Sequence, residues 1–194
     1  MTRRILGAAA VAAALAATAA PANAAPDTST LNPAPSDWYT CEDTGSGASC
    51  HGKQTFTYAG GFDGSCAQGF DILENGIKHE TARRDYDRDG NLVRRYLHDN
   101  WPNDPANILY NSITGKSVHY VSHVTEIDTF LIPGDFGSKV AETYGNGYTV
   151  TGPGGLLIKD AGVLTFGPDD EVLERHGPKM LFDGDNEALC AALA

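Results

Sequence analysis

Basic side chains are scarce in this chain. Lysine and arginine number 14 against 25 aspartates and glutamates, which gives a formal net charge of −11. A surface this acidic repels nucleic-acid phosphates and anionic lipid headgroups. After residue 24, no apolar run approaches the roughly 20 residues that a transmembrane helix needs. We therefore expect no nucleic-acid partner and no membrane partner.

The sequence also lacks the signatures of common catalytic and zinc sites. It contains neither a C-x-x-C pair nor a G-x-S-x-G motif. His79 and Glu80 begin an H-E-x-x-H motif, but Arg83 stands where the second histidine belongs. His119 and His123 are four residues apart, which on a strand means about 13 Å, too far for one metal ion. The pattern predicts no cofactor and no metal, and it favours a non-enzymatic protein.

Carboxylates, by contrast, are abundant. Two facing carboxylates can hydrolyse a glycosidic bond, and Asp128, Asp135 and Glu142 are candidates at predicted exposed turns. A small carboxylate-dependent extracellular hydrolase is therefore an alternative to a binding protein. An inhibitor of a secreted enzyme, presenting the loop 41–50, is a further alternative.

The N-terminus has the pattern of a signal peptide. Arg3 and Arg4 precede an alanine-rich apolar run over 5–20, and an A-x-A cleavage signal stands at 22–24. Removal of residues 1–24 takes away both arginines and lowers the net charge from −11 to −13. The chain is therefore expected to be secreted into the extracellular space.

All four cysteines follow this segment, and an even number in an exported chain predicts disulfides. Cys41 and Cys50 flank a short turn rich in glycine and serine, so the chain can fold back between them. A bond between Cys66 and Cys190 would tie a C-terminal helix to the first long strands. We predict the pairs Cys41–Cys50 and Cys66–Cys190.

Turn signals divide most of the chain into short segments. Pairs such as Asn-Gly and Asp-Gly recur, for example at 75–76, 89–90 and 146–147, mostly about 8–14 residues apart. The segments between them alternate apolar and polar residues, as strands do. The pattern predicts an all-β antiparallel meander that closes into a small up-and-down β-barrel, with a β-sandwich as the alternative. A short C-terminal helix is expected over 185–193.

Residues 25–37 differ from the rest in composition. They are rich in proline, serine and threonine, and Leu31 is their only large apolar side chain. Such a segment is expected to be a flexible leader whose removal leaves the stability unchanged. The remaining residues, 38–194, have the length of one domain, and we expect a single disulfide-stapled β domain there.

The run D-Y-D-R-D-G resembles the start of a calcium loop. Asp85, Asp87 and Asp89 occupy loop positions 1, 3 and 5, and Gly90 occupies position 6. Position 12 should be a glutamate, but it is Tyr96, and no amphipathic helices flank the run. We therefore predict a β-hairpin at this place instead of a metal site.

Four groups of residues carry a resemblance to a known family. They lie at 66–70, 107–119, 152–162 and 189–193. Together they resemble a family of small secreted proteins of high-GC Gram-positive bacteria, over about 66–193. The family has no established activity, so the resemblance implies secretion and supplies no catalytic residues.

The expected function is that of a secreted, non-enzymatic binding or structural β-barrel. An eight-stranded barrel can be filled by side chains or can hold one small ligand. Its partner would be a small apolar ligand or an extracellular protein. The residues that would line a ligand cavity, or else fill the core, are Phe70, Ile72, Tyr110, Tyr120 and Phe166.

Overall fold

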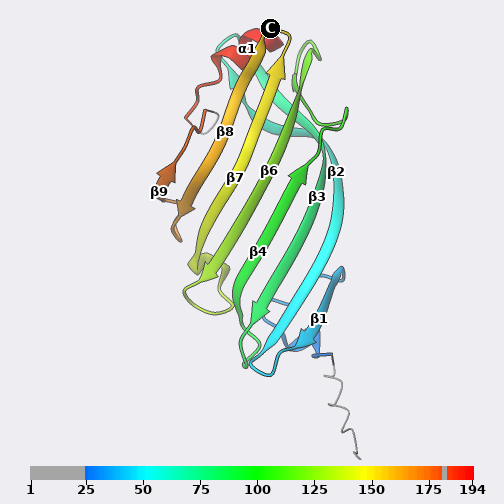
Figure 1. Ribbon diagram of the computed structural model, residues 1–194, viewed down its shortest axis with the longest axis vertical. Coiled ribbons are helices and arrows are strands. Elements are labelled where there is room, and N and C mark those ends of the chain that lie inside the picture. The colour runs from blue at the N-terminus through cyan, green and yellow to red at the C-terminus, as the bar shows by residue number, and fades with distance from the viewer. Residues whose placement is uncertain (1–24, 181–182) are drawn as a thin grey trace, which may run out of the picture.

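The computed structural model describes residues 25–180 and 183–194, so the predicted signal peptide lies outside the described residues. Strands make up most of this part of the chain (Figure 1). They are β1 (Tyr39–Asp43), β2 (Ala48–Cys66), β3 (Phe70–Tyr86), β4 (Leu92–Trp101), β5 (Ile108–Asn111), β6 (Ser117–Phe130), β7 (Lys139–Gly152), β8 (Gly155–Phe166) and β9 (Val172–His176). Short helices follow the same order: η1 (Thr28–Thr30), η2 (Phe136–Ser138) and α1 (Glu187–Leu193).

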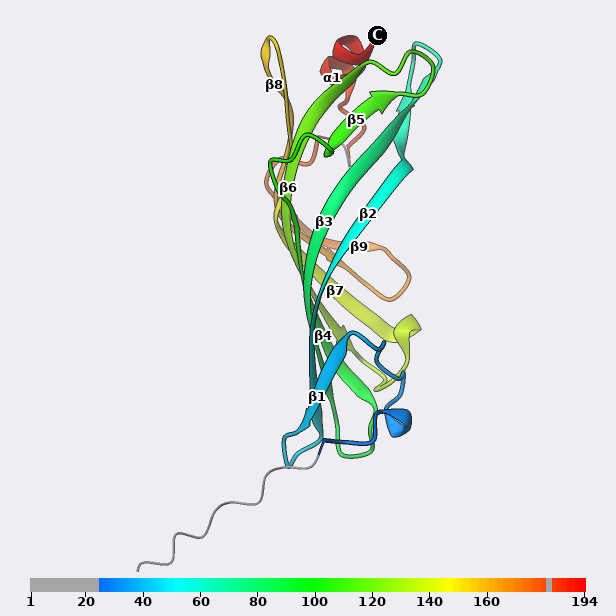
Figure 2. The ribbon, with the colours of Figure 1, turned by 90° about the vertical axis from the view of Figure 1, so that its right-hand side faces the viewer.

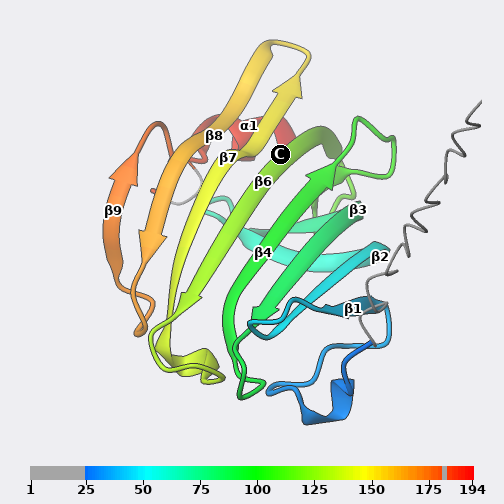
Figure 3. The ribbon, with the colours of Figure 1, turned by 60° about the horizontal axis from the view of Figure 1, so that its bottom comes forward.

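The strands form one antiparallel sheet in the order β1-β2-β3-β4-β6-β7-β8-β9. Figure 3 shows this order from β1 at one edge to β9 at the other. The short strand β5 leaves the path and pairs with both β3 and β6, which closes a partial ring of β3, β4, β5 and β6. The predicted antiparallel all-β fold with a short C-terminal helix is confirmed. The predicted barrel is not closed, because β1 and β9 lie at opposite edges of the sheet and only β3, β4, β5 and β6 form a ring.

The two faces of the curved sheet differ. Helix α1 and the N-terminal segment with η1 lie on one side, which we call the covered face (Figure 2). The opposite side, which faces the viewer in Figure 1, is the open face. Because side chains alternate along a strand, Ala82 and Tyr86 of β3 point to the covered face, and the exposed Thr81 and Arg83 point to the open face.

One end of the covered face holds the larger apolar cluster. Leu189 and Leu193 of α1 are fully buried against the sheet, and Cys190 forms a disulfide with Cys66 at the end of β2. This cross-link and the Cys41–Cys50 bond between β1 and β2 match the predicted pairs. Two disulfides are typical of proteins that fold in an oxidising compartment. The cluster comprises Cys66, Phe70, Ile72, Leu109, Val118, Tyr120, Val150, Ile158, Leu189, Cys190 and Leu193.

A second apolar cluster lies at the other end of the covered face, and the segment 25–37 contributes to it. Leu31 is only 7% exposed and packs in this cluster. The backbone of Asn32 bonds to both sides of the neighbouring turn, through the oxygen of Gly90 at 2.7 Å and the nitrogen of Leu92 at 2.8 Å. The expectation of a flexible leader is therefore wrong, because one buried leucine and a few backbone bonds dock the segment.

The D-Y-D-R-D-G run forms the predicted hairpin between β3 and β4. Asp85 pairs with Arg94 in the ladder. The Oδ1 atom of Asp87 accepts hydrogen bonds from the backbone nitrogens of Asp89 and Asn91, at 3.0 and 2.8 Å. The aspartates thus have separate roles in the strand and in the turn.

Candidate functional site

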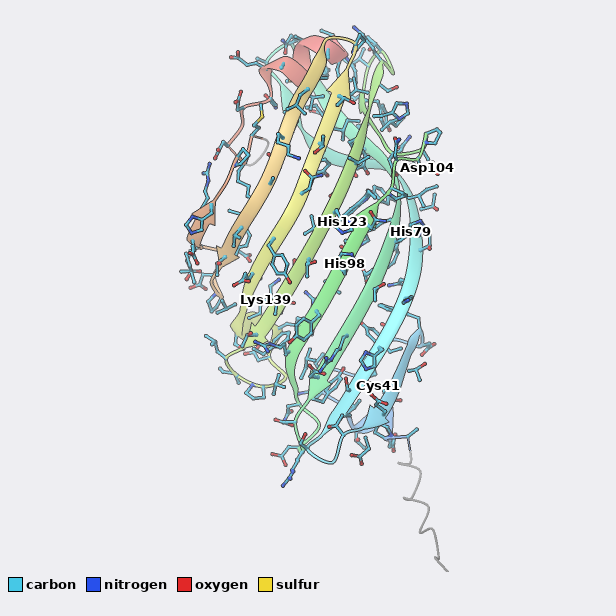
Figure 4. All side chains as sticks on the ribbon, in the orientation of Figure 1. Cys41, His79, His98, Asp104, His123 and Lys139 are labelled. Atoms are coloured by element: carbon cyan, nitrogen blue, oxygen red, sulfur yellow. A yellow bond between two sulfur atoms is a disulfide. The ribbon has the colours of Figure 1, made fainter. Side chains whose placement is uncertain are left out.

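All six histidines of the chain belong, by register, to the open face. Cross-strand partners share a face, so the row that begins at His98 of β4 continues across the sheet through Thr125, Tyr144, Val163 and His176. The remaining four histidines reach this face through the pairing and alternation of β2, β3 and β6, and they are His51, His79, His119 and His123. Figure 4 shows three of them on the neighbouring strands β3, β4 and β6.

The open face also carries a shallow depression of about 580 Å³ near β1. Gly52, Ala82 and Leu97 are cross-strand neighbours in β2, β3 and β4, and they lie in its middle. Because Ala82 and Leu97 point to the covered face and Gly52 has no side chain, the floor is mainly backbone. The other lining residues are Trp38, Thr40, His51, Lys53, Thr81, Arg83, Tyr96, His98 and Thr125.

Two rows of cross-strand partners form the walls of this depression. One row is His51, Arg83 and Tyr96, and the other is Lys53, Thr81, His98 and Thr125. The rows carry hydroxyl, imidazole, aromatic and cationic groups. No lining residue is acidic, although the chain has 25 acidic residues. The depression is therefore locally suited to an anionic ligand.

The Arg83 guanidinium is held at the wall of the depression. Its Nε donates to Oδ1 of Asp85 at 2.8 Å, and its central carbon lies 5.5 Å from the centroid of the Tyr96 ring. Asp85 raises the pKa of Arg83, so this group stays charged. The bond to Asp85 uses Nε and not the two terminal nitrogens, which can therefore donate to a ligand.

A polar network lies on the covered face and joins five strands around the Glu74 carboxylate. Oε1 of Glu74 accepts hydrogen bonds from the hydroxyls of Tyr58, at 2.5 Å, and Tyr120. The indole of Trp101 donates to the Tyr58 oxygen at 2.6 Å. Burial, followed by the hydrogen bond to Glu74, raises the pKa of Tyr58 to about 12 and also raises that of Tyr120. These groups stay protonated, and their role is to hold the strands together.

Asp63 extends this network into a largely buried place. The Tyr148 hydroxyl lies 3.4 Å from its Oδ1 and 3.3 Å from Oε2 of Glu74. Its Oδ2 is buried without a hydrogen-bond partner among the described residues. Burial, and then the negative charge of Glu74, raise the pKa of Asp63 to about 6.

The candidate carboxylates of the hydrolase alternative are dispersed. Asp128, expected at an exposed turn, lies inside β6 with an exposure of 0% and is ion-paired with Arg95. Arg95 also donates to Glu126 at 2.9 Å, and burial followed by the Asp128 charge raises the pKa of Glu126. Asp135 caps η2, and Glu142 is exposed on β7. The three candidates therefore do not form one site.

The residues predicted to line a ligand cavity are only partly brought together. Phe70, Ile72 and Tyr120 are buried in the larger apolar cluster. Tyr110 is half-buried and alternates with the buried Leu109 of β5. Phe166 is half-buried and pairs with Ala141, away from that cluster.

The open-face site was not found by sequence reasoning, because its residues are far apart along the chain. His51, Lys53, Thr81, Arg83 and His98 are polar residues of three different strands, and no motif marks them as a group. Among the described residues, no group of three or more histidine, cysteine or acidic side chains is arranged to hold a metal ion.

Comparison with known proteins does not add to this geometry. No family model, no curated protein and no solved structure matches the chain. Within the described ranges, none of the helices has the length and apolar character needed to cross a membrane.

Proposed function

We propose that the protein is an exported, non-enzymatic binding protein whose open-face depression binds an acidic carbohydrate. The observation that carries the proposal is the lining of the depression, which combines cationic, hydroxyl and aromatic side chains with no acidic one. Because the chain as a whole is acidic, a lining without acidic side chains differs from the overall composition.

Each group has a role that suits a sugar acid. Guanidinium groups match the planar carboxylate and can donate two hydrogen bonds to it, and Arg83 is placed to do so. Hydroxyl groups such as those of Thr81 and Thr125 can exchange hydrogen bonds with sugar hydroxyls. An aromatic ring such as Tyr96 offers an apolar surface with a polar edge.

The proposal also includes that the protein is exported and that it belongs to the family of small secreted proteins. The two disulfides and the signal-peptide pattern of residues 1–24 support secretion. The motifs within 66–193 support membership of the family of small secreted proteins that they resemble.

Isothermal titration with short oligogalacturonates tests the proposal. We expect binding of the acid form, and binding at least about tenfold weaker when the carboxylates are methyl-esterified, because Arg83 and Lys53 then lose their charged partner. Arg83→Ala and Tyr96→Ala should each weaken binding of the acid form by about tenfold. Arg88→Ala removes the same charge from the exposed β3–β4 turn and is the matched control.

Two results would refute this function. Equal affinity for the acid and the ester, or no binding of either, would exclude an acidic carbohydrate as the ligand. Binding that is unchanged by Arg83→Ala and Tyr96→Ala would place the ligand elsewhere on the protein.

A further inference from the structure

We propose that the ligand is a polymer, an acidic polysaccharide chain that lies across the strands of the open face and contacts Tyr144 beyond the depression. This inference rests on the carbohydrate function proposed above. It adds the length of the ligand, its direction on the sheet and a further binding residue, because Tyr144 is not among the residues that line the depression.

The depression is long in the direction across the strands. Its lining residues come from five neighbouring strands, from Thr40 of β1 to Thr125 of β6. Neighbouring strands are about 4.8 Å apart, so the four intervals give a length of about 19 Å. A 1,4-linked pyranose chain advances by a similar distance with each sugar unit, so the depression has room for about four units in line. A single sugar would leave most of this length empty.

Beyond β6, the two rows that form the walls of the depression differ in charge. The row of Tyr96 reaches the exposed Glu142 on β7. The row of His98 reaches Tyr144 on the same strand. A carboxylate repels an anionic polymer, so an acidic chain is expected to leave the depression along the row of His98.

The row of His98 and the next row beside it form a strip without acidic side chains. The first row crosses the sheet through Lys53, Thr81, His98, Thr125, Tyr144, Val163 and His176. The second row consists of Thr55, His79, Asn100, His123, Asn146 and Ala161. At β9 the Glu174 carboxylate lies 2.8 Å from the His176 ring. The strip therefore suits an anionic chain from β2 to β8 and not further.

Tyr144 provides a contact where the depression ends. It is 37% exposed and lies directly opposite Thr125, the last lining residue on β6. A tyrosine ring offers an apolar surface, on which a pyranose ring can pack, and a hydroxyl at its edge. The additional strand interval lengthens the path to about 24 Å, which is enough for about five sugar units.

Two histidine rings beside this path are held in place. Nδ1 of His98 lies 2.9 Å from Oγ1 of Thr125, and Nδ1 of His123 lies 3.2 Å from Oδ1 of Asn100. The two rings also contact each other, with centroids 4.5 Å apart, and Figure 4 shows them on neighbouring strands. Because these contacts use Nδ1, each Nε2 can exchange hydrogen bonds with sugar hydroxyls. Side chains that are already fixed lose less conformational entropy when a ligand binds.

Calorimetric titration with oligogalacturonates of defined length tests the inference. We expect the hexamer to bind at least about tenfold more tightly than the trimer, because each further unit makes its contacts within a complex that is already formed. Tyr144→Ala should weaken binding of the hexamer about fivefold. Binding of the trimer should change less than about twofold, because a trimer centred on Arg83 does not reach β7, three strand intervals away.

Phe56→Ala is the matched control. Phe56 is also 37% exposed, but it is the cross-strand partner of Lys78 and therefore lies on the covered face. This variant should bind the trimer and the hexamer as the native chain does. Circular dichroism of both variants checks that the fold is intact.

The outcomes separate this inference from the function on which it rests. Equal affinity for the trimer and the hexamer, or unchanged hexamer binding in Tyr144→Ala, would overturn the polymer inference while the acid form is still preferred over the methyl ester. Equal affinity for the acid and the ester hexamer would instead overturn the acidic-carbohydrate function, and with it the inference.

Discussion

Asp63→Asn should stabilise the protein at neutral pH. The Asp63 carboxyl is largely buried, its Oδ2 lacks a hydrogen-bond partner in the described structure, and Glu74 adds a negative charge nearby. These conditions disfavour the ionised form and raise the pKa from 3.8 to about 6. Asparagine keeps the shape and an oxygen for the Tyr148 hydroxyl, but it carries no charge.

The sign and the pH window follow from linkage. The unfolded state releases the Asp63 proton near pH 3.8 and the folded state releases it near pH 6. The contribution of Asp63 to stability therefore falls as the pH rises from about 4 to about 6. One pKa unit corresponds to about 1.4 kcal/mol, so the full shift costs on the order of 3 kcal/mol above pH 6.

Thermal unfolding followed by circular dichroism can measure this effect. In a domain of this size, about 3 kcal/mol corresponds to a rise in Tm of about 6–12 °C. We expect a rise of this order at about pH 7.5 and little difference from the native chain at about pH 4. Asp89→Asn makes the same charge change in the exposed β3–β4 turn and should have little effect. A rise in Tm that is equal at both pH values, or absent at the higher one, would refute the reasoning.

Three further outcomes are expected. Leu31→Ala should lower the free energy of unfolding by about 2–3 kcal/mol because it leaves a cavity in the smaller apolar cluster. A chain that begins at Trp38 should melt at least about 5 °C lower. An unchanged Tm of the shortened chain would show that the segment 25–37 does not dock in solution. The Tm should be the same within about 1 °C in millimolar calcium and in chelator, because Asp87 already accepts two backbone hydrogen bonds and Asp85 is paired with Arg83. A rise in Tm of several degrees with calcium that Asp87→Ala abolishes would contradict the hairpin interpretation. Replacing Cys66 and Cys190 by serine should lower the free energy of unfolding by about 5 kcal/mol, against about 3 kcal/mol for Cys41 and Cys50. The reason is that the first pair is 124 residues apart in sequence and the second only 9. Denaturant titration of the two double variants measures both losses, and equal losses would contradict the chain-entropy explanation.

Local signals in the sequence predicted much of the fold. The Asp89-Gly90 turn predicted the β3–β4 hairpin, because glycine adopts the positive φ of 81° found there. The spacing of Leu189 and Leu193 predicted the buried face of α1. In both places the local structure depends on residues that are close in sequence, so a short sequence pattern is enough to predict it.

Features that depend on distant partners were not predictable in this way. The docking of Leu31 requires β3 and β4 to be in place, and the burial of Asp128 requires Arg95 from another strand. His98 and His123 meet because β4 pairs with β6 and not with β5, the next strand along the chain. Register between strands is set by the whole hydrophobic pattern and by turn geometry, and no short motif records it.

The sheet consists mostly of hairpins that follow one another along the chain, and this order suggests how the molecule assembles. Seven of its ladders join successive strands, so each hairpin closes a short loop at a small cost in chain entropy. The Cys41–Cys50 bond lies within the first hairpin, whereas Cys66–Cys190 must wait until α1 reaches the end of β2. Oxidation of the reduced chain should therefore occur in two stages, with the long-range bond sealing the larger apolar cluster last.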